Sequence, residues 1–363
     1  MVAKLRVGII GVGNISPAYI QGCRAFDVLE LMACADINME RARAVAEEHA
    51  IPRALSVEAL LADPDIDVVV NLTVPAVHAE VSLSVLRAGK HVYSEKPLAL
   101  TLADGRAILD EAAARGLRVG CAPDTFLFGQ HQTARRVLDE GTIGTPVAAV
   151  AFMAGHGPES WHPNPGFFYA PGGGPMLDMG PYYVTCLVNL FGPAVRVSGA
   201  ARASFPERLA HTGERIPVRV PTHYAGTIEF ASGAIATLIT SFDVWGHHLP
   251  VMEVYGELGT LTIPDPNGFD PREVRLMQPG TEGWASLPLA YPDAWKRGIG
   301  LADMAYAIEA NRPHRASGDL AYHVLEIMSA FATAYESGQY VTMASTVAQP
   351  ELLPLGLGER VLS

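Results

Sequence analysis

The segment LRVGIIGVGNIS, residues 5–16, decides the fold of the first part of this chain. Its first half, Leu5–Ile10, is a short run of mainly apolar residues, which is typical of a buried strand. The glycine-rich half, GVGNIS, follows directly at the expected start of a helix. Gly11 permits a tight turn there, and Gly13 allows the backbone to approach a pyrophosphate closely. This arrangement predicts a strand, a turn and a helix that together bind a dinucleotide.

The start of the predicted helix supplies further contacts. Ser16 stands where the G-x-G-x-x-G pattern has its third glycine, and that position needs only a small residue for packing of the helix against the strand. The first N–H groups of a helix have no partner within it and lie at the positive end of its dipole. We therefore expect the cofactor phosphates at this helix start, beside Asn14 and Ile15.

An acidic residue at the end of the next strand selects the type of dinucleotide. Asp36 follows Gly13 by 23 residues, close to the spacing at which a carboxylate accepts hydrogen bonds from a ribose 2′-hydroxyl. The same carboxylate would repel the 2′-phosphate of NADP. NAD is therefore the predicted cofactor, with NADP as the alternative because Arg41 and Arg43 lie nearby and could receive a phosphate.

The first 122 residues alternate short apolar strands with helical segments, the pattern of a doubly wound parallel sheet in an α/β fold. The predicted strands are Leu5–Ile10, Leu29–Ala35, Val68–Leu72, His91–Tyr93 and Arg118–Cys121. The predicted helices are Ile15–Ala25, Met39–His49, Val77–Ala88 and Leu102–Ala114. The sequence thus predicts an N-terminal Rossmann domain, residues 1–122, that carries the dinucleotide site.

From about residue 145 the pattern changes to hairpins. Segments 225–240 and 253–263 each contain two alternating apolar runs with glycine near the turn, which predicts antiparallel strand pairs. The Pro- and Gly-rich segment 155–175 fits neither a strand nor a helix and predicts a long functional loop. A helix is expected near Asp319–Glu336. We expect a second, α+β domain, residues 123–363, with an open mixed, largely antiparallel sheet.

Composition and charge exclude several classes of protein. The 363 residues are 49% hydrophobic and 18% charged, as in globular chains with sizeable cores. A formal charge of −12 offers no broad basic face for nucleic acid. The apolar runs are too short to span a membrane, and the N-terminus lacks the order of a signal peptide. The sequence therefore predicts neither nucleic-acid nor membrane partners.

The cysteines and histidines indicate neither disulfides nor a metal site. The four cysteines are scattered, without C-x-x-C spacing, which predicts buried free thiols in a reducing, cytoplasmic location. The histidines show no compact H-x-x-x-H or H-E-x-x-H pattern, so we expect no bound metal.

Two further segments follow predicted strands, where doubly wound sheets place ligands. One is NLTVPAVH, residues 71–78, and the other is HVYSEKPLAL, residues 91–100, in which Lys96 precedes Pro97. X-Pro bonds are mostly trans, but a tight functional turn is where a cis bond would be found. By itself, the EKP tripeptide is also compatible with a plain surface turn.

A third segment, GGGPMLDMGPYYV (172–184), places Asp178 four residues before Tyr182. On a helix, both side chains would project from one face. Pro181 cannot continue an interior hydrogen-bond ladder, so we expect it in a first helical turn or at a local distortion. Asp178 is a substrate contact, a helix N-cap, or both.

GVGNIS, the T-x-P-x-x-H within NLTVPAVH, EKP and GGGPMLDMGPYY occur in the order and approximate spacing of one family. The sequence resembles the Gfo/Idh/MocA oxidoreductases over nearly its whole length. The resemblance implies hydride transfer between a nicotinamide ring and a secondary alcohol or ketone of a sugar, polyol or related carbohydrate. It also implies a homo-oligomer, dimer or tetramer, that forms through the open sheet of the second domain.

The resemblance also implies roles for individual positions. Lys96 matches the catalytic lysine of the family, and Asp178 matches its substrate-orienting aspartate. Tyr182 stands where much of the family has histidine, as in the glucose–fructose oxidoreductase and dihydrodiol dehydrogenase branches. The other matching positions are expected to contact the cofactor, together with Lys96: Thr73, Pro75, His78 and Glu95.

Oxidation of an alcohol requires a base for the hydroxyl proton. A tyrosine with an unperturbed pKa of about 10 is a poor base at neutral pH, but a nearby ammonium stabilises its phenolate. Lys96 could supply that charge and also donate a hydrogen bond to the substrate oxygen. The sequence leaves open whether Tyr182 or its neighbour Tyr183 is the acid/base.

Further substrate residues are expected in loop 155–175, which has an aromatic and polar composition suited to a sugar. Its candidates are His156, Glu159, Trp161 and His162. Asp124, just after the last strand of the first domain, is another. A third group is equally compatible with a surface or a pocket location: Asp243, Trp245 and His247.

Two other functions are compatible with the sequence. One is a dinucleotide-binding sensor or regulator without catalysis, and the other is a glycosidase that acts through transient oxidation with bound NAD. The intact Lys96, and the absence of a DNA-binding segment from this sequence, favour the dehydrogenase or reductase over the regulator.

Overall fold

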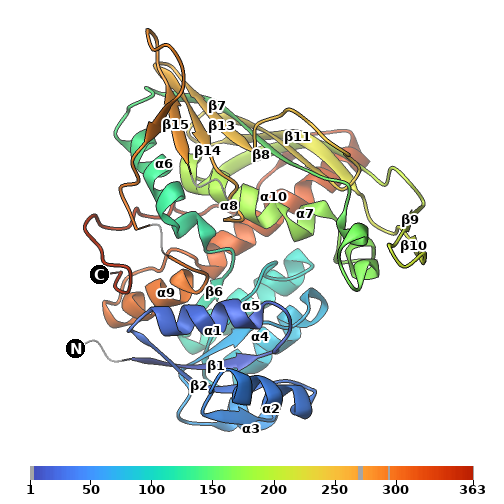
Figure 1. The fold of residues 1–363 in the computed structure, drawn as a ribbon, viewed down its shortest axis with the longest axis vertical. Coiled ribbons are helices and arrows are strands. Elements are labelled where there is room, and N and C mark those ends of the chain that lie inside the picture. The colour runs from blue at the N-terminus through green and yellow to red at the C-terminus, as the bar shows by residue number, and fades with distance from the viewer. Residues whose placement is uncertain (1–3, 269–272, 293–294, 363) are drawn as a thin grey trace. The chain divides into compact units, whose positions relative to one another are not determined.

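The computed structural model describes residues 4–268, 273–292 and 295–362, and it divides into two compact units (Figure 1). The first unit comprises Met1–Gly129, Tyr291–Tyr322 and Leu353–Ser363. The second comprises Gln130–Ala290 and His323–Leu352. The first unit thus takes in two later segments that a single division at residue 122 would assign to the second domain.

The first unit contains a parallel sheet, as the sequence predicts. The strand order is β3-β2-β1-β4-β5-β6, and every pairing is parallel. The bounds are β1 (Leu5–Ile10), β2 (Leu29–Ala35), β3 (Arg53–Leu55), β4 (Val68–Asn71), β5 (His91–Ser94) and β6 (Val119–Cys121). The order reverses at β1 and β4, and doubly wound sheets bind ligands beyond the carboxyl ends of such strands.

The predicted helices of this unit are confirmed to within one residue at each end. They are α1 (Ser16–Ala25), α2 (Met39–Glu48), α4 (His78–Arg87) and α5 (Leu102–Arg115). The Asn38 side chain caps α2 by accepting hydrogen bonds from two backbone N–H groups, and the Thr101 side chain caps α5 in the same way with one. The sequence prediction missed β3, whose three residues are only half-buried, and the short helix α3 (Val57–Ala62).

The later segments join the first unit through backbone contacts at β6. After α9 (Ile299–Glu309), the chain returns alongside β6, where Cys121 N–H donates to the Ala316 carbonyl at 3.1 Å. Gly120 and Ser317 also form an isolated bridge. No local sequence pattern predicts these contacts, because the two partners are almost two hundred residues apart in the chain.

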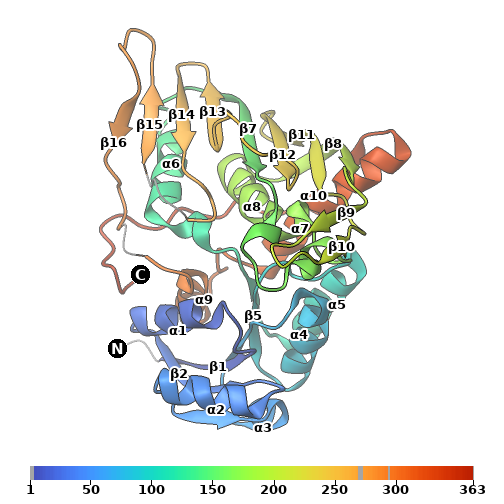
Figure 2. The same ribbon diagram turned by 45° about the vertical axis from the view of Figure 1, so that its right-hand side comes forward.

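The second unit is built on a nine-stranded mixed sheet in the order β16-β15-β14-β13-β7-β12-β11-β8-β17 (Figure 2). Its strands are β7 (Pro146–Ala154), β8 (Ala194–Arg202), β11 (His223–Phe230), β12 (Ile235–Ser241), β13 (Met252–Gly256), β14 (Gly259–Ile263), β15 (Val274–Met277), β16 (Ala285–Leu287) and β17 (Val341–Thr342). The β11–β12 and β13–β14 hairpins confirm the two that the sequence predicts. The β7–β12 pairing is parallel, and the other pairings described in this sheet are antiparallel.

Helices α6 (Gly129–Asp139), α8 (Gly180–Phe191) and α10 (Gly318–Ser337) lie on one side of this sheet in both ribbon views (Figures 1 and 2). Gly199 of β8 and Gly226 of β11 are paired, and a Cβ at either would come within 3 Å of the Phe331 ring. Two adjacent glycines thus leave room for an aromatic side chain of α10. This helix confirms the one predicted near Asp319–Glu336.

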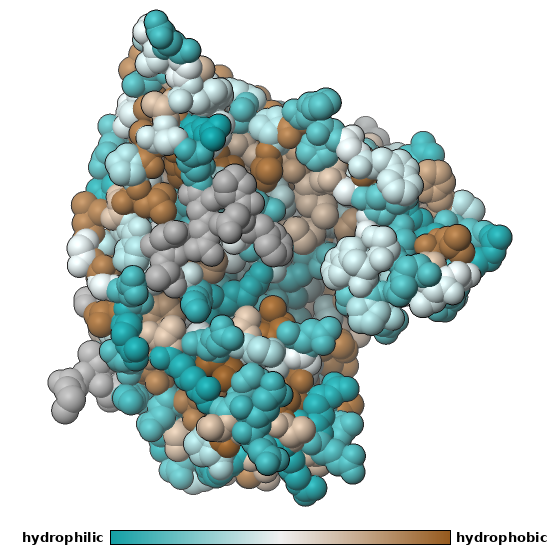
Figure 3. Space-filling model, in the orientation of Figure 1, coloured by the Kyte–Doolittle hydropathy of each residue, from teal (hydrophilic) through white to brown (hydrophobic). Residues whose placement is uncertain are grey.

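Burial and surface composition agree with the sequence-based expectations. All four cysteines are buried and unpaired. Among the described helices, none combines the length and hydrophobicity that a membrane span requires. On the face drawn in Figure 3, hydrophilic and hydrophobic residues are interspersed.

Candidate active site

The turn after β1 contains two glycines with different roles. Gly11 has a φ of +94°, and a Cβ on it would lie 2.8 Å from the Leu72 carbonyl carbon, so only glycine fits there. A Cβ on Gly13 would meet no heavy atom within 4 Å. Gly11 is therefore required by the packing of β1 beside the segment after β4, whereas Gly13 leaves open space next to the backbone. That space is what a pyrophosphate needs.

The start of α1 has no side-chain cap. Ile15 occupies the N-cap position and makes no side-chain cap hydrogen bond, and Asn14 is exposed. The Ser16 hydroxyl and N–H both donate to the Gly13 carbonyl, at 2.8 and 3.0 Å. The turn is thus closed on itself, while the helix start lacks the side-chain acceptor that usually satisfies it. An anion fits this position.

Asp36 is fixed at the carboxyl end of β2 by two backbone donors. One carboxylate oxygen accepts from Val12 N–H at 3.0 Å, and the other accepts from Asn38 N–H at 2.9 Å. Each oxygen retains acceptor capacity for ribose hydroxyl groups. Arg41 and Arg43 are both exposed on α2. The residues present therefore fit NAD.

His78 connects the segment after β4 to the turn after β5. Its buried ring lies between two carbonyl oxygens: Nδ1 is 2.8 Å from that of Pro97, and Nε2 is 2.9 Å from that of Thr73. Burial lowers the pKa of His78, and a neutral imidazole donates to only one of these oxygens. Pro75 begins a 3₁₀ turn, Pro75–Val77, between the two contacts. These contacts show His78 positioning two loops of the predicted cofactor site.

Glu95 holds the backbone of the EKP turn. Its buried carboxylate accepts from the Tyr19 hydroxyl at 2.8 Å and from Lys96 N–H at 2.9 Å. A guanidinium nitrogen of Arg297 lies 3.9 Å from the same carboxylate. The Lys96–Pro97 peptide bond is cis, and Lys96 is half-buried. The predicted catalytic lysine thus projects from a turn that is fixed on both sides.

Asp124 has contacts that differ from its expected role as a substrate residue. Its side chain is fully buried, and one carboxylate oxygen accepts from the N–H groups of Gly298 and Gly300, at 2.8 and 3.0 Å. Burial raises the pKa of this carboxyl group. These donors lie at the start of α9, so Asp124 anchors a later segment to the first unit and is not carried into the proposed site.

In the second unit, the triple glycine is a structural turn before the short helix α7 (Pro175–Asp178). Gly174 has a φ of +88°, and a Cβ on it would come 2.9 Å from the Pro221 carbonyl oxygen. Its N–H donates to the Phe168 carbonyl at 2.7 Å. The glycines therefore let the chain pass close to other backbone segments.

Asp178 and Tyr182 lie on two successive helices, which corrects the expectation of one continuous helix. Asp178 ends α7, Met179 is the N-cap residue of α8, and Tyr182 belongs to the first turn of α8. The physical reason is Pro181, which lacks an N–H and occupies the first turn, as predicted. Met179, and not Asp178, stands at the N-cap, so the N-cap interpretation of Asp178 is wrong.

The two adjacent tyrosines differ in their surroundings. The Tyr183 hydroxyl donates to the Asp265 carboxylate at 3.3 Å, and its side chain is buried. Burial, followed by the negative charge of Asp265, raises the pKa of Tyr183 well above its usual value. A phenol in this state is a poor proton acceptor at neutral pH. The contact with Asp265 therefore argues against Tyr183 as the acid/base.

Arg208, which the sequence analysis did not single out, is the centre of a buried clamp in the second unit. Its guanidinium donates to Glu159 and to Asp243, each at 2.8 Å, and to the carbonyl groups of His156 and Phe242, at 2.6 and 2.8 Å. The Arg208 side chain is 5% exposed, and both carboxylates are 8% exposed. Glu159, expected to face a sugar, is instead committed to this clamp.

No pattern in the sequence identifies Arg208. It lies on β9 (Glu207–Leu209), which pairs with β10 (Arg215–Pro217) in a small hairpin. The surrounding segment, PERLAHTGER, has the composition of a solvated turn. The charge of Arg208 is buried only because two acidic residues from distant segments meet it.

The predicted aromatic residues of loop 155–175 have different exposures. His156 is half-buried and stacks on Trp245, with ring centroids 3.4 Å apart and an interplanar angle of 15°. Trp161 is 67% exposed, and His162 packs edge-on against Phe168 with centroids 4.9 Å apart. Trp245 thereby contacts loop 155–175 through His156, and both Trp245 and His247 are exposed.

Two family models cover most of the chain. Residues 5–122 match the oxidoreductase family with an NAD-binding Rossmann fold, and residues 131–262 match the GFO/IDH/MocA C-terminal domain. A 1,5-anhydro-D-fructose reductase from Ensifer adhaerens is 30% identical over 352 residues, which cover 92% of this chain and 97% of the relative. The chain belongs to the Gfo/Idh/MocA oxidoreductase family. It is therefore an oxidoreductase with an NAD-binding domain.

Two other known proteins are similar over a smaller part of the chain or in fold. A trans-1,2-dihydrobenzene-1,2-diol dehydrogenase from Macaca fascicularis is 31% identical, over 67% of this chain and 72% of its own. The structure of levoglucosan dehydrogenase with NADH and L-sorbose superposes with a TM-score of 0.82 at 22% identity, over 94% of this chain and 99% of that one. At this identity, the structural match shows the fold alone.

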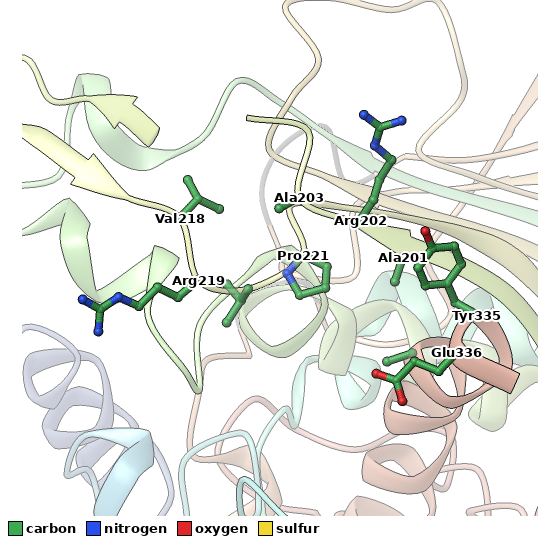
Figure 4. Close-up of a pocket in the computed structure, with 10 residues that line it drawn as sticks. Ala201, Arg202, Ala203, Val218, Arg219, Pro221, Tyr335 and Glu336 are labelled. Carbon is green, nitrogen blue, oxygen red and sulfur yellow. The ribbon is translucent and has the colours of Figure 1, made fainter. Parts of the chain in front are cut away.

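A pocket of the second unit, about 390 Å³ in volume, contains none of the residues that match the family motifs. It is lined by residues of β8, of the segment before β11 and of α10. Figure 4 shows the Arg202 and Arg219 guanidinium groups pointing in different directions, so they do not form a two-armed anion clamp. Among the described residues, no group of three or more His, Cys, Asp or Glu side chains forms a metal-binding cluster.

Proposed function

We propose that this oxidoreductase interconverts a secondary alcohol and a ketone of a sugar or related carbohydrate, with NAD as the preferred cofactor. The observation that carries this proposal is that the family motifs lie in both matched domains, with Lys96 retained in the fixed turn after β5. The substrates named for the relatives, an anhydro-sugar ketone and a cyclic diol, support an alcohol or ketone on a ring.

The first 122 residues are proposed to hold the cofactor. The open space beside Gly13 and the start of α1 at Asn14 and Ile15 would receive the pyrophosphate. The Asp36 carboxylate would accept the ribose hydroxyl groups and disfavour a 2′-phosphate. Thr73, Pro75, His78 and Glu95 would shape the remainder of the site from the segments after β4 and β5. Bound NAD supplies the acceptor, and NADH the donor, of a hydride.

Residues 123–363, with Lys96 from the first domain, are proposed to act on the substrate. Lys96 would donate a hydrogen bond to the reacting oxygen and hold positive charge as that oxygen loses its proton. Tyr182 would accept the proton in oxidation and return it in reduction. Asp178 would accept hydrogen bonds from a neighbouring hydroxyl group and so orient the substrate. His156, Trp161 and His162 would contact the rest of the sugar.

We further propose that the chain forms a homo-oligomer, dimer or tetramer, through the face of the nine-stranded sheet away from α8 and α10. We also propose that the protein is cytoplasmic. The position of these two helices on one side of the sheet supports the first point (Figures 1 and 2). Four buried free cysteines support a reducing compartment. Sedimentation velocity measures the assembly directly, and a monomer at micromolar concentration would contradict this part of the proposal.

The test is a substrate panel followed by absorbance at 340 nm, with NAD, NADP and their reduced forms. The panel contains 1,5-anhydro-D-fructose, levoglucosan, pyranose sugars, simple glycosides, cyclic diols and linear polyols. We expect substrate-dependent turnover that is faster with NAD or NADH. No turnover on any member, with cofactor binding shown by fluorescence, would contradict the proposal. Release of free sugar from a glycoside without net NADH would instead select the glycosidase.

A further inference from the structure

The loops that follow β7 and β12 leave the second sheet at the same end, because these two strands are parallel. Their register pairs Ala154 with Ser241, the last residues of the two strands. Beyond this point, Gly155 N–H donates to the Ser241 carbonyl, and Val244 N–H donates to the Gly155 carbonyl, each at 3.0 Å. Side chains that follow the two strands, 89 residues apart in sequence, therefore meet at this end.

The residues that meet are His156 and Trp245. Their rings are nearly parallel, 15° apart in orientation, with centroids separated by 3.4 Å. Trp245 is 86% exposed, so the face of the indole that does not contact His156 is open. Leaving an indole this exposed forgoes the free energy that its burial would contribute. An aromatic ring that is supported on one face and open on the other is suited to bind a flat apolar partner.

The Arg208 clamp fixes both ring-bearing segments. Its guanidinium holds the His156 carbonyl at 2.6 Å and the Asp243 carboxylate, two residues before Trp245, at 2.8 Å. The other Asp243 oxygen accepts from the Thr222 hydroxyl at 2.7 Å. The stack is therefore formed in the folded chain before any ligand binds, which lowers the entropy cost of using it.

The same contacts continue to the helix that carries Asp178. Thr222 follows Pro221, whose carbonyl oxygen packs against Gly174 at the start of α7. Helix α7 also contacts β11 and β12. The stacked rings and the predicted substrate-orienting aspartate thus belong to one connected part of the second unit.

We propose that the open face of Trp245, supported by His156, stacks against the apolar face of a ring-closed sugar. This inference rests on the proposed function and deepens it, because it names the substrate class. A pyranose or furanose ring presents several C–H groups on one face, which pack against the negative face of an aromatic ring. An open-chain polyol has no fixed apolar face to present. Burial and the nearby Arg208 charge lower the pKa of His156, which favours the neutral form of the supporting ring.

The experiment compares Trp245→Ala and Trp245→Phe with the unmodified chain, using the best ring-closed substrate of the panel and its open-chain polyol counterpart. For the ring-closed substrate, we expect Trp245→Ala to raise KM roughly tenfold with little change in kcat, and Trp245→Phe to retain most of the affinity. For the polyol, kcat/KM should not change. Trp284→Ala, at a 41% exposed tryptophan between β15 and β16, is the matched control and should leave both substrates unaffected.

The outcomes separate this inference from the proposed function. If the unmodified chain oxidises ring-closed sugars and Trp245→Ala leaves KM unchanged, stacking is wrong and the proposed function stands. If no member of the panel is turned over, the NADH-bound protein is titrated with ring-closed sugars by calorimetry. Sugar binding that becomes weaker in Trp245→Ala would support the stacking site. The absence of any sugar binding would overturn it. Dissociation of an oligomer by Trp245→Ala would make the indole a subunit contact and also overturn the proposal.

Discussion

The two units hold their predicted site residues in different ways. In the first unit, Asp36 accepts hydrogen bonds from the backbone of Val12 and Asn38, and His78 contacts the carbonyl groups of Thr73 and Pro97. In the second, Arg208 reaches the Glu159 and Asp243 side chains, 49 and 35 residues away. These contacts of Asp36 and His78 run from side chain to backbone, whereas the Arg208 clamp also pairs charged side chains with one another.

This difference teaches where each site tolerates change. Backbone donors and acceptors are present whatever the side chains, so the cofactor site depends on a few residues at strand ends and on glycines such as Gly11. A clamp of buried charges depends on every member, because removal of one leaves another buried without its partner. The substrate end is therefore the more vulnerable to single substitutions, and it can also diverge by exchanging loops.

The largest expected effect separates the two tyrosines of the second unit. Tyr182→Phe should lower kcat about 10²- to 10⁴-fold, the usual range for a general acid or base, and leave NADH affinity unchanged. Tyr183→Phe should keep turnover near that of the unmodified chain, because its hydroxyl is engaged by Asp265. Steady-state kinetics and NADH fluorescence measure both effects. Equal losses of kcat in both variants would show that Tyr182 and Tyr183 do not differ in their contribution to turnover.

The second effect tests the clamp. Arg208→Ala should destabilise the protein by about 3–5 kcal/mol, because it leaves Glu159 and Asp243 buried and unpaired. Arg6→Ala, which breaks more exposed ion pairs to Asp65 and Asp67 in the first unit, should cost much less. Urea denaturation compares the two. A smaller loss of unfolding free energy for Arg208→Ala than for Arg6→Ala would contradict the proposed difference between the units.

The third effect is acid sensitivity shared by both units. Burial lowers the pKa of His131, in the second unit, and of His314, in the first, to about 4. The unfolded chain binds these protons at a pKa of about 6.5. Each residue therefore stabilises the fold above pH 6.5 and loses that contribution as the pH falls towards 4, a loss of roughly 3 kcal/mol per residue.

Denaturation at intervals from pH 7 to pH 4 measures this dependence. His131→Leu should flatten the slope of stability against pH in that window. His247→Leu, at an exposed position, is the control and should not. An unchanged slope in His131→Leu would show that this histidine binds its proton in the folded protein at the same pKa as in the unfolded chain.

The smallest effect concerns the cofactor end. Asp36→Asn should weaken NAD binding about tenfold, because it removes the charged acceptor of the ribose hydroxyl groups. The ratio of the affinity for NAD to the affinity for NADP should therefore become smaller. The side-chain oxygen of asparagine can still accept one of the two backbone hydrogen bonds, so the turn is retained. Titration with both cofactors measures the change. An unaltered preference would place cofactor selection elsewhere, with Arg41 and Arg43 as the first candidates.

Much of the fold could be predicted because it follows local patterns. The five predicted strands of the first sheet are short, mainly apolar runs, and the two predicted hairpins have glycine near their turns. The strand β3 was missed because its residues are half-buried and give no such run. Helix α8 could not be separated from α7 by spacing alone, since the effect of Pro181 depends on which helical turn it occupies.

The candidate reacting residues came from the resemblance of their motifs to those of one family. By itself, the sequence determined the position of the cofactor motif and the alternation of strands and helices in the first unit. These depend on side-chain periodicity and on the conformational range of glycine and proline, which are local properties. Only the tertiary structure decided which groups contact Arg208, Glu159, Asp124 and Tyr183. Folding decides which distant donor or acceptor lies beside such a polar group. That neighbour determines whether the group is used within the protein or is available to a substrate, because a buried charge must be paired. The stack of His156 on Trp245 belongs to the same class, since it exists only because β7 and β12 end side by side.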